Sequence, residues 1–201
     1  MPRVLAGFLA TLLALFLLAL PARADFHVRI GPDGLHKQDW FLKGSGDLRT
    51  DLAKAADQGK DLILLVEQVG CYYCKLLHEV NFANEALVEN LTGAYLVLQL
   101  DMYGEGEITD LDGRTMTQEE LVRAWGINTT PTTVVLAASN PPATSRAGAE
   151  VFRLPGYLKP FQYDAALAYF ASGSYRDQEF SQYMTRRMAA LKAQGLDPEN
   201  W

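Results

Sequence analysis

The segment DLILLVEQVGCYYCK, residues 61–75, joins an unbroken apolar run to the only two cysteines of the chain. Apolar side chains at every position from 62 to 66 are typical of a central strand that is covered on both faces. Cys71 and Cys74 follow this strand and lead into a helical pattern through residues 76–80. The two cysteines are therefore expected at the carboxyl end of a strand, the edge at which α/β sheets carry out their chemistry.

The rest of the chain continues this alternation of strands and helices, and its 201 residues are 49% hydrophobic and 21% charged, as expected for one globular domain. Asn84 and the capping box of Thr117 and Glu120 predict helix starts, and Asp112-Gly113 predicts a hairpin turn. Further helices are expected over 47–58, 160–172 and 177–194, and strands over 94–101, 132–137 and 150–154, the last antiparallel to its predecessor. This order predicts an α/β fold, a three-layer α/β/α sandwich with a central mixed sheet and an extra C-terminal helix.

The first 24 residues have the pattern of a secretory signal peptide. Arg3 is followed by an unbroken apolar run over residues 4–20 and then by the small-residue site Ala22-Arg23-Ala24. This pattern predicts cleavage before Asp25 and a single mature domain over residues 25–201. The apolar run approaches the length of a membrane span, so an uncleaved N-terminal anchor is the alternative, and contact with a membrane is expected only through this leader.

Charge narrows the classes of partner. The chain has a formal net charge of −6, and without the leader it keeps 16 basic and 24 acidic residues, a net charge of −8. An acidic surface without a basic cluster argues against nucleic acid as a partner. Export also implies that the two cysteines are oxidised unless another molecule reduces them.

The spacing of Cys71 and Cys74 is compatible with four kinds of site. A c-type haem requires a histidine directly after the second cysteine, where this chain has Lys75. Zinc requires two further ligands, and no second pair at zinc spacing accompanies the candidate histidines 27, 36 and 78. A structural disulfide across two intervening residues would close too small a loop to add much stability.

A redox pair explains the placement of the cysteines best. The N-terminus of a helix stabilises a thiolate, so Cys71 is the expected nucleophile and Cys74 the expected resolving thiol. No cofactor is needed for this chemistry, and no metal is expected. A non-catalytic metal-binding CxxC protein remains an alternative.

Two motifs in this order resemble the thioredoxin superfamily: Cys71-Tyr72-Tyr73-Cys74 after a buried strand, and Thr130-Pro131 at the start of the third strand. The resemblance covers residues 42–172, with residues 173–201 as a C-terminal helical extension. It implies a thioredoxin fold, thiol-disulfide oxidoreductase activity on protein disulfides, and a cis Pro131 beside the cysteines. The backbone of Thr130 would then be a docking edge for a substrate strand. Tyr72 and Tyr73 would form an apolar collar for the same substrate, with local packing as the alternative.

More narrowly, the leader, the VEQVGCYYCK form, the polar hairpin and the extra helix resemble the periplasmic SoxW-type thioredoxins of bacterial sulfur oxidation. This resemblance implies a periplasmic reductase, with a cysteine-bearing sulfur-carrier protein as partner and a membrane thiol carrier of the DsbD or CcdA type as reductant. The stretch CYYCKLLHE and the Thr before Pro131 are similar to the catalytic domain of DsbC-type disulfide isomerases. Isomerase or oxidase activity is the alternative.

Three charged or titratable residues are candidate modulators of the cysteines. The buried acid of the family, six residues before the first cysteine, is replaced by Leu65, and the nearest carboxylate, Glu67, shares its strand face. Glu67 is a candidate proton relay for Cys74, although a charge at a strand end is usually solvated. Lys75 is expected to be solvated or to hold Cys71 ionised, and His78 to titrate near the site or to lie on the surface. On the final helix, Met184 and Met188 are expected to fill the core.

Overall fold

The computed structural model describes residues 28–139, 141–199 and 201. The predicted leader, residues 1–24, lies outside the described residues. Within the described part, no helix has the length and apolar character needed to cross a membrane.

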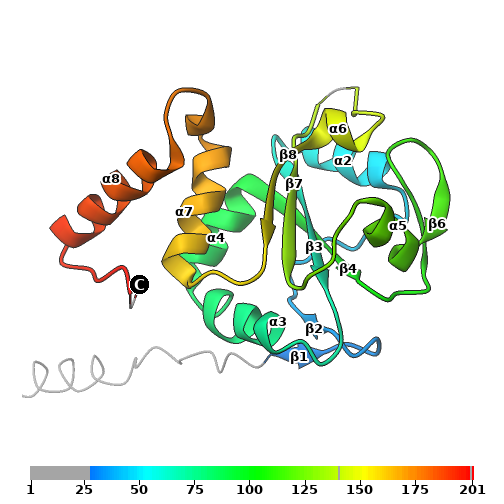
Figure 1. Ribbon diagram of the computed structural model, residues 1–201, viewed down its shortest axis with the longest axis horizontal. Helices are drawn as coiled ribbons and strands as arrows, with labels where there is room; N and C mark the ends of the chain where they lie inside the picture. Colours follow the sequence, from blue (N-terminus) through cyan, green and yellow to red (C-terminus); the bar gives the residue numbers. More distant parts are fainter. Residues whose placement is uncertain (1–27, 140, 200) are drawn as a thin grey trace, which may run out of the picture.

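A mixed sheet of four strands, in the order β4-β3-β7-β8, forms the centre of the fold (Figure 1). Its second strand, β3 (Asp61–Glu67), is parallel to β4 (Tyr95–Asp101) and antiparallel to β7 (Thr132–Leu136). The fourth strand, β8 (Glu150–Pro155), is antiparallel to β7. Because β3 is flanked on both sides and buried from its second residue on, the reading of residues 62–66 as a central strand is confirmed.

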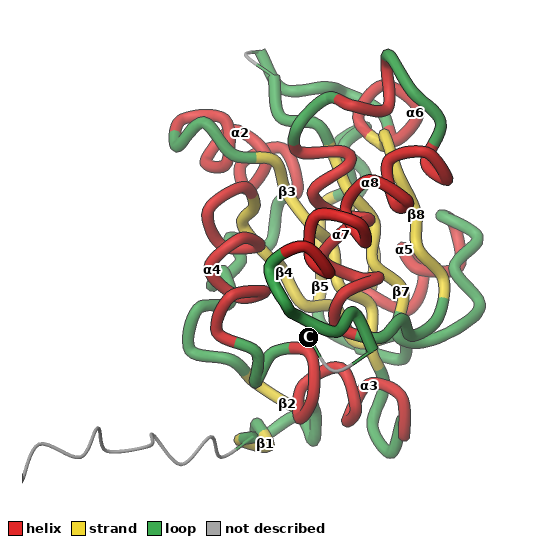
Figure 2. The backbone as a smooth tube through the Cα atoms, turned by 90° about the vertical axis from the view of Figure 1, so that its left-hand side faces the viewer, coloured by secondary structure: helices red, strands yellow, loops and turns green. Residues whose placement is uncertain are grey.

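Helices cover both faces of this sheet, which gives the predicted three-layer sandwich (Figures 1 and 2). On one face, α4 (Glu85–Ala94), α7 (Pro160–Ala171) and the turn after the cysteines pack against alternate residues of β3 such as Ile63 and Leu65. On the other face, α2 (Leu48–Asp57) and α5 (Gln118–Ala124) pack against Leu64 and Val66. The sequence caps these helices as expected: side chains of Asp47, Asn84 and Thr117 each accept a backbone N–H of the first turn.

Two small hairpins and two short helices complete this body. The first hairpin, β1 (Arg29–Ile30) with β2 (His36–Lys37), precedes α2. The second, β5 (Glu107–Thr109) with β6 (Thr115–Thr117), contains the predicted Asp112-Gly113 turn. The four-residue helix α6 (Arg146–Ala149) leads directly into β8. The cysteines lie at the start of α3 (Tyr72–Leu76), which continues into a π-helical turn, η2 (Leu77–Asn81).

The C-terminal helix α8 (Phe180–Ala193) lies outside α7 and has no buried residue (Figures 1 and 2). It starts later than predicted, after the short turn η3 (Ser174–Arg176), so Asp177 and Glu179 precede the helix and do not form its first turn. The prediction that its methionines fill the core was wrong, because Met188 is 36% exposed. Helix α8 packs chiefly against α7.

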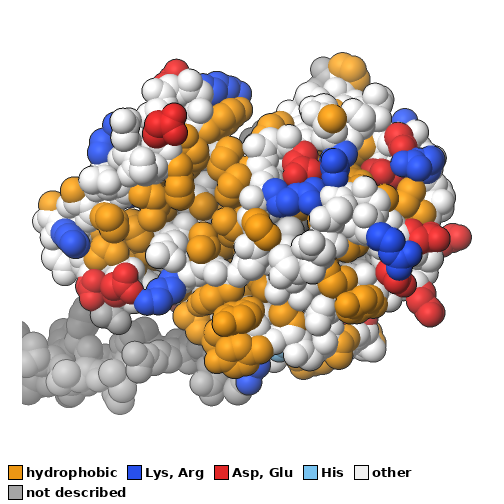
Figure 3. Space-filling model, viewed as in Figure 1, with side chains coloured by type: hydrophobic (Ala, Val, Ile, Leu, Met, Phe, Trp, Pro, Cys, Tyr) orange, Lys and Arg blue, Asp and Glu red, His pale blue; other side chains and the backbone are white. Residues whose placement is uncertain are grey.

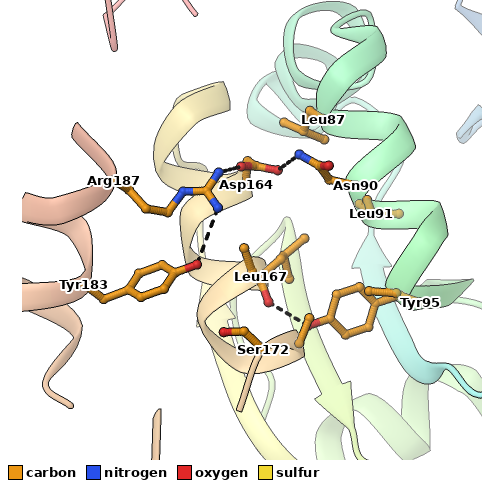
Figure 4. A pocket seen from close by; sticks show the side chains of 12 residues that line it. Leu87, Asn90, Leu91, Tyr95, Asp164, Leu167, Ser172, Tyr183 and Arg187 are labelled. Carbon is orange, nitrogen blue, oxygen red and sulfur yellow. Dashed lines mark hydrogen bonds and ion pairs between the residues drawn. The ribbon is translucent and has the colours of Figure 1, made fainter. Parts of the chain in front are cut away.

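One ion pair connects α8 to the body across an open cavity of about 340 Å³ between α4, α7 and α8. Arg187 Nη2 of α8 lies 2.6 Å from Asp164 Oδ2 of α7. Figure 4 shows this contact as a dashed line. The other oxygen of the same carboxylate accepts a hydrogen bond from Asn90 of α4 at 2.9 Å. Apolar side chains of α4 and α7 line the cavity below these polar groups.

Candidate functional site

The two cysteines form a disulfide at the start of α3, where β3 has just ended. Cys71 is the N-cap residue of α3, and its Sγ accepts a hydrogen bond from the backbone N–H of Cys74 at 3.0 Å. Cys71 keeps 8% of its surface exposed, whereas Cys74 keeps 1%. Only the first sulfur can therefore meet a partner molecule, and it does so where the N–H groups of a helix start stabilise a thiolate.

A cis proline loop from a distant part of the chain lies against Cys71. The Thr130-Pro131 peptide bond is cis, as the resemblance predicts. The hydroxyl of Thr130 donates to Cys71 Sγ at 3.4 Å, and the carbonyl of Pro131 accepts from Gly156 N at 2.8 Å. The loop before β7 thus contacts the exposed sulfur, and the residue after β8 hydrogen-bonds to this loop.

Three tyrosines form a rim beside the disulfide. Tyr72 and Tyr73, between the cysteines, are 65% and 54% exposed. Tyr73 stacks on Tyr157, with ring centroids 5.9 Å apart and ring planes 20° apart. Figure 3 shows hydrophobic side chains gathered over α3 on this face of the molecule. Sequence reasoning did not identify Tyr157, although an aromatic residue directly after the glycine that ends β8 was a usable signal.

Below the disulfide, two candidate modulators form a buried pair. Glu67 is 1% exposed and His78 is completely buried, and Glu67 Oε2 lies 3.0 Å from His78 Nε2. The alternatives of a solvated Glu67 and a surface His78 were therefore wrong. The rings of Phe41 and Phe82 enclose the imidazole at 5.7 and 5.2 Å. His78 lies one helical turn after Cys74, and both residues are buried, so they share the inward face of this turn.

Two glutamines that sequence reasoning missed hold this pair in place. Gln99 Nε2 donates to Glu67 Oε2 at 2.5 Å, and Gln38 Nε2 contacts His78 Nδ1 at 3.1 Å. Gln99 is the one uncharged polar residue within the apolar strand β4, which was a usable signal. Gln38 follows the first hairpin, and nothing in its local sequence indicates a contact with residue 78.

The position of the family's buried acid is apolar here. Leu65 is fully buried, and its partner across the sheet, Thr133, hydrogen-bonds the Tyr163 hydroxyl at 3.0 Å. Burial, together with the nearby Glu67 carboxylate, raises the pKa of the Tyr163 hydroxyl, so this group stays protonated. Glu67 is thus the carboxylate that the strand face below the disulfide provides.

Lys75, the third candidate modulator, points away from this pair. It is exposed and lies 3.7 Å from Glu79, one turn further along the chain. The ring of His36 is a further neighbour of His78, with the two ring centroids 5.3 Å apart. Burial is the main cause that lowers the pKa of His36, and the neighbouring His78 lowers it further. Among the described residues, no group of three or more His, Cys, Asp or Glu side chains is arranged to hold a metal ion.

Comparisons with known proteins agree with this geometry. A sequence model described as a thioredoxin-like domain matches residues 48–171. Among solved structures, a thioredoxin-fold protein from Helicobacter pylori is 21% identical, with a TM-score of 0.54 over 76% of this chain and 89% of that chain. A thioredoxin from Thermus thermophilus is 23% identical, with a TM-score of 0.42 over 56% of this chain and 74% of that one. No curated protein gives a significant sequence match.

The chain belongs to the thioredoxin-like family, because the matched domain spans more than half of its residues. The fold, the CxxC pair and the hydrogen bond from the cis proline loop to Cys71 define a thiol-disulfide oxidoreductase. Proteins of this family act on protein disulfides, and the exposed Cys71 sulfur is the atom of this chain that can do so.

Proposed function

We propose that this protein is an exported periplasmic reductase that transfers electrons from a membrane dithiol carrier to disulfides of partner proteins. The observation that carries the proposal is the asymmetry of the cysteine pair: Cys71 is accessible at a helix start, and Cys74 is buried behind it. Such a pair forms a transient bond with a partner through one sulfur and releases it through the other.

The reaction runs in two exchanges. The Cys71 thiolate attacks a partner disulfide, so that a Cys71–partner bond forms and the other partner sulfur leaves as a thiolate. The Cys74 thiol then loses its proton and attacks Cys71 Sγ, which restores the Cys71–Cys74 bond and releases the second partner thiolate. Two electrons pass to the partner. The dithiol carrier then reduces the Cys71–Cys74 bond by the same kind of exchange, and its own two sulfurs become a disulfide.

The surrounding residues have distinct roles in this proposal. Thr130 and Pro131 offer a backbone edge to the substrate strand, and Tyr72 and Tyr73 cover its apolar side chains. Glu67 accepts the proton of Cys74, because it is the buried carboxylate beneath that residue. Lys75 adds a positive charge one helical turn from Cys71.

The partner proposed is a periplasmic sulfur-carrier protein with an accessible cysteine, and the reductant a membrane thiol carrier of the DsbD or CcdA type. The leader pattern, the VEQVGCYYCK form and the resemblance to SoxW-type thioredoxins support both assignments. In an oxidising compartment the Cys71–Cys74 bond is the resting state, so a reductase there requires such a source of electrons.

The central test uses two matched cysteine variants. Cys74→Ser should trap a partner as a mixed disulfide on Cys71, whereas Cys71→Ser should trap nothing and abolish insulin reduction. Equal trapping by both variants would contradict the assigned roles. Capture of the carrier protein by Cys74→Ser in periplasmic extracts would support the partner assignment.

The reduction potential separates reductase from the alternative activities. We expect a value near about −270 mV by thiol trapping in glutathione buffers, as for a reductant. A value near about −120 mV, or efficient repair of scrambled disulfides, would instead support an oxidase or an isomerase.

A further inference from the structure

The carboxylate of Glu67 uses only one of its two oxygens. Oε2 accepts hydrogen bonds from His78 at 3.0 Å and from Gln99 at 2.5 Å. Oε1 is equally buried, yet none of the described residues donates a hydrogen bond to it. A buried oxygen without a donor is costly, so this arrangement calls for a specific explanation.

A chain of contacts from the N-terminal hairpin fixes which oxygen is occupied. Lys37 Nζ can only donate, and it donates to Gln99 Oε1 at 2.6 Å. The Nε2 group of Gln99 must then face the other way, where it donates to Glu67 Oε2 and to the His36 carbonyl at 2.8 Å. The orientation of this amide is thus determined by β2.

A second contact from the same segment fixes the histidine. Gln38 Nε2 carries only donors, so His78 Nδ1 must accept from it. The imidazole proton then lies on Nε2 and points at Glu67 Oε2. Through Gln99 and His78, residues 37 and 38 therefore direct two hydrogen-bond donors to the same carboxylate oxygen, Glu67 Oε2. Both residues precede the matched thioredoxin-like domain, which begins at residue 48.

We propose that Lys37 and Gln38 are positioning residues that direct the vacant Oε1 of Glu67 to take the proton of Cys74. The inference rests on the proposed exchange reaction and assigns a role in it to a segment outside the family domain. When Cys74 attacks Cys71 Sγ, the sulfur–sulfur bond of the enzyme forms, the bond to the partner breaks, and the partner leaves as a thiolate. The proton of the Cys74 thiol moves to Oε1 and later passes to the solvent or the released thiolate.

Removing Lys37 weakens this arrangement. Without its ammonium group, Gln99 Oε1 loses its donor, and a positive charge is removed from the surroundings of Glu67. Gln99 Nε2 still faces two acceptors, Glu67 Oε2 and the His36 carbonyl, so the amide keeps its orientation. Loss of the positive charge favours the protonated carboxyl group, so Glu67 would serve as proton acceptor only at higher pH. Lys37→Arg keeps a donor and should restore the original behaviour.

Other titratable groups surround Glu67, and all but Asp33 keep their contacts in this variant. They lie on every neighbouring element: His78 on η2, Tyr163 on α7, His36 on β2 and Asp101 beside Glu67 on β4. Asp33 loses its bond to Lys37, and Lys75 and Glu79 act on His36. Except for Asp33, these groups keep their contacts in the variant, and Lys37→Arg keeps a donor for Asp33 as well.

The test measures the resolving step directly. Reduced full-length protein is mixed with 5,5′-dithiobis(2-nitrobenzoic acid): attack by Cys71 releases the first nitrothiobenzoate, and attack by Cys74 releases the second. The rate of the second release is measured against pH. Lys37→Met should move its pH midpoint upward by about one unit, with the first release unchanged. Lys37→Arg should return the midpoint to the wild-type value.

Two control variants make the result decisive. Lys54→Met removes an exposed positive charge from α2, on the other face of the sheet, and should leave the midpoint unchanged. Glu67→Gln should remove the part of the pH dependence that Glu67 contributes and leave the part due to ionisation of the Cys74 thiol, and Lys37→Met should add nothing in that background. If Glu67→Gln removes the Glu67 part but Lys37→Met behaves like Lys54→Met, the role of the hairpin is refuted and the Glu67 relay stands. If Glu67→Gln has no effect, the relay itself is refuted.

Discussion

Removing either member of the buried Glu67–His78 pair should destabilise the protein, but the two losses of stability should be unequal. His78→Leu leaves an ionised carboxylate buried with Gln99 as its one remaining donor, and breaking a buried charged contact in this way costs about 3–5 kcal/mol. Glu67→Leu leaves the imidazole of His78 with one unpaired N–H, which costs about 1–3 kcal/mol. The difference follows from the group left behind, a carboxylate in the first variant and an imidazole N–H in the second.

The double variant Glu67→Leu/His78→Leu should be more stable than His78→Leu alone. It replaces the pair by apolar side chains and loses only the contacts of Gln38 and Gln99. We therefore expect its free energy of unfolding to lie about 1–3 kcal/mol below that of wild type. The measurement is urea unfolding of the oxidised protein for all four members of the cycle. Single effects that add to within about 0.5 kcal/mol would show that the two side chains do not act as a pair. Equal single effects would contradict the predicted order of the two variants.

Three further predictions concern residues away from the cysteines. Trp125→Phe removes the buried indole donor at 3.1 Å from Asp110 and should cost about 1–3 kcal/mol in urea unfolding. Arg187→Met breaks the 2.6 Å contact with Asp164 and should speed hydrogen exchange in α8 by about threefold to fivefold, whereas Arg186→Met on the same helix should not. Burial raises the pKa of Asp164 above its usual value of 3.8, so the stability that this residue contributes is complete below that value and is lost as the pH rises through the folded-state pKa. The stability of Asp164→Asn relative to wild type should therefore improve between about pH 3 and pH 7, and a constant difference would contradict the assignment.

The sequence predicts the parts of the fold that depend on local patterns. The run over residues 62–66 is apolar on both faces, and such a run needs neighbours on both sides, so the central position of β3 follows from it. The caps at Asn84 and Thr117 are read equally well, because each side chain bonds a backbone group only three residues away.

The burial of His78 could also have been predicted from the sequence, but the prediction placed the wrong face of the helix toward the core. Taking Val80 as part of the inward stripe turns the helix outward at position 78, yet Val80 is 42% exposed. Starting from the buried Cys74, the inward positions are 77, 78, 81 and 82, three and four residues apart. The π-turn that closes with Phe82 N donating to the Leu77 carbonyl at 2.9 Å widens this inward face.

The environment of Glu67 could not be read from local sequence. Its neighbours Gln38 and Gln99 lie on two other segments, and the strand-end position by itself favours a solvated charge. Burial at this position depends on the hairpin and the residues after it, which cover the edge of the sheet beside α3. A contact of this kind is determined by tertiary packing, which periodicity does not encode.

The two segments outside the matched domain therefore affect different parts of the molecule. The C-terminal helix α8 contacts α7 through Arg187 and lies on the outer side of that helix, whereas the N-terminal hairpin reaches the carboxylate beneath Cys74. Attack by Cys71 depends on the helix start and the cis proline loop, both of which are inside the family domain. Differences between this protein and other members of its family should for that reason appear in the pH dependence of the resolving step, where Lys37, Gln38 and Gln99 act, rather than in the rate of the first attack.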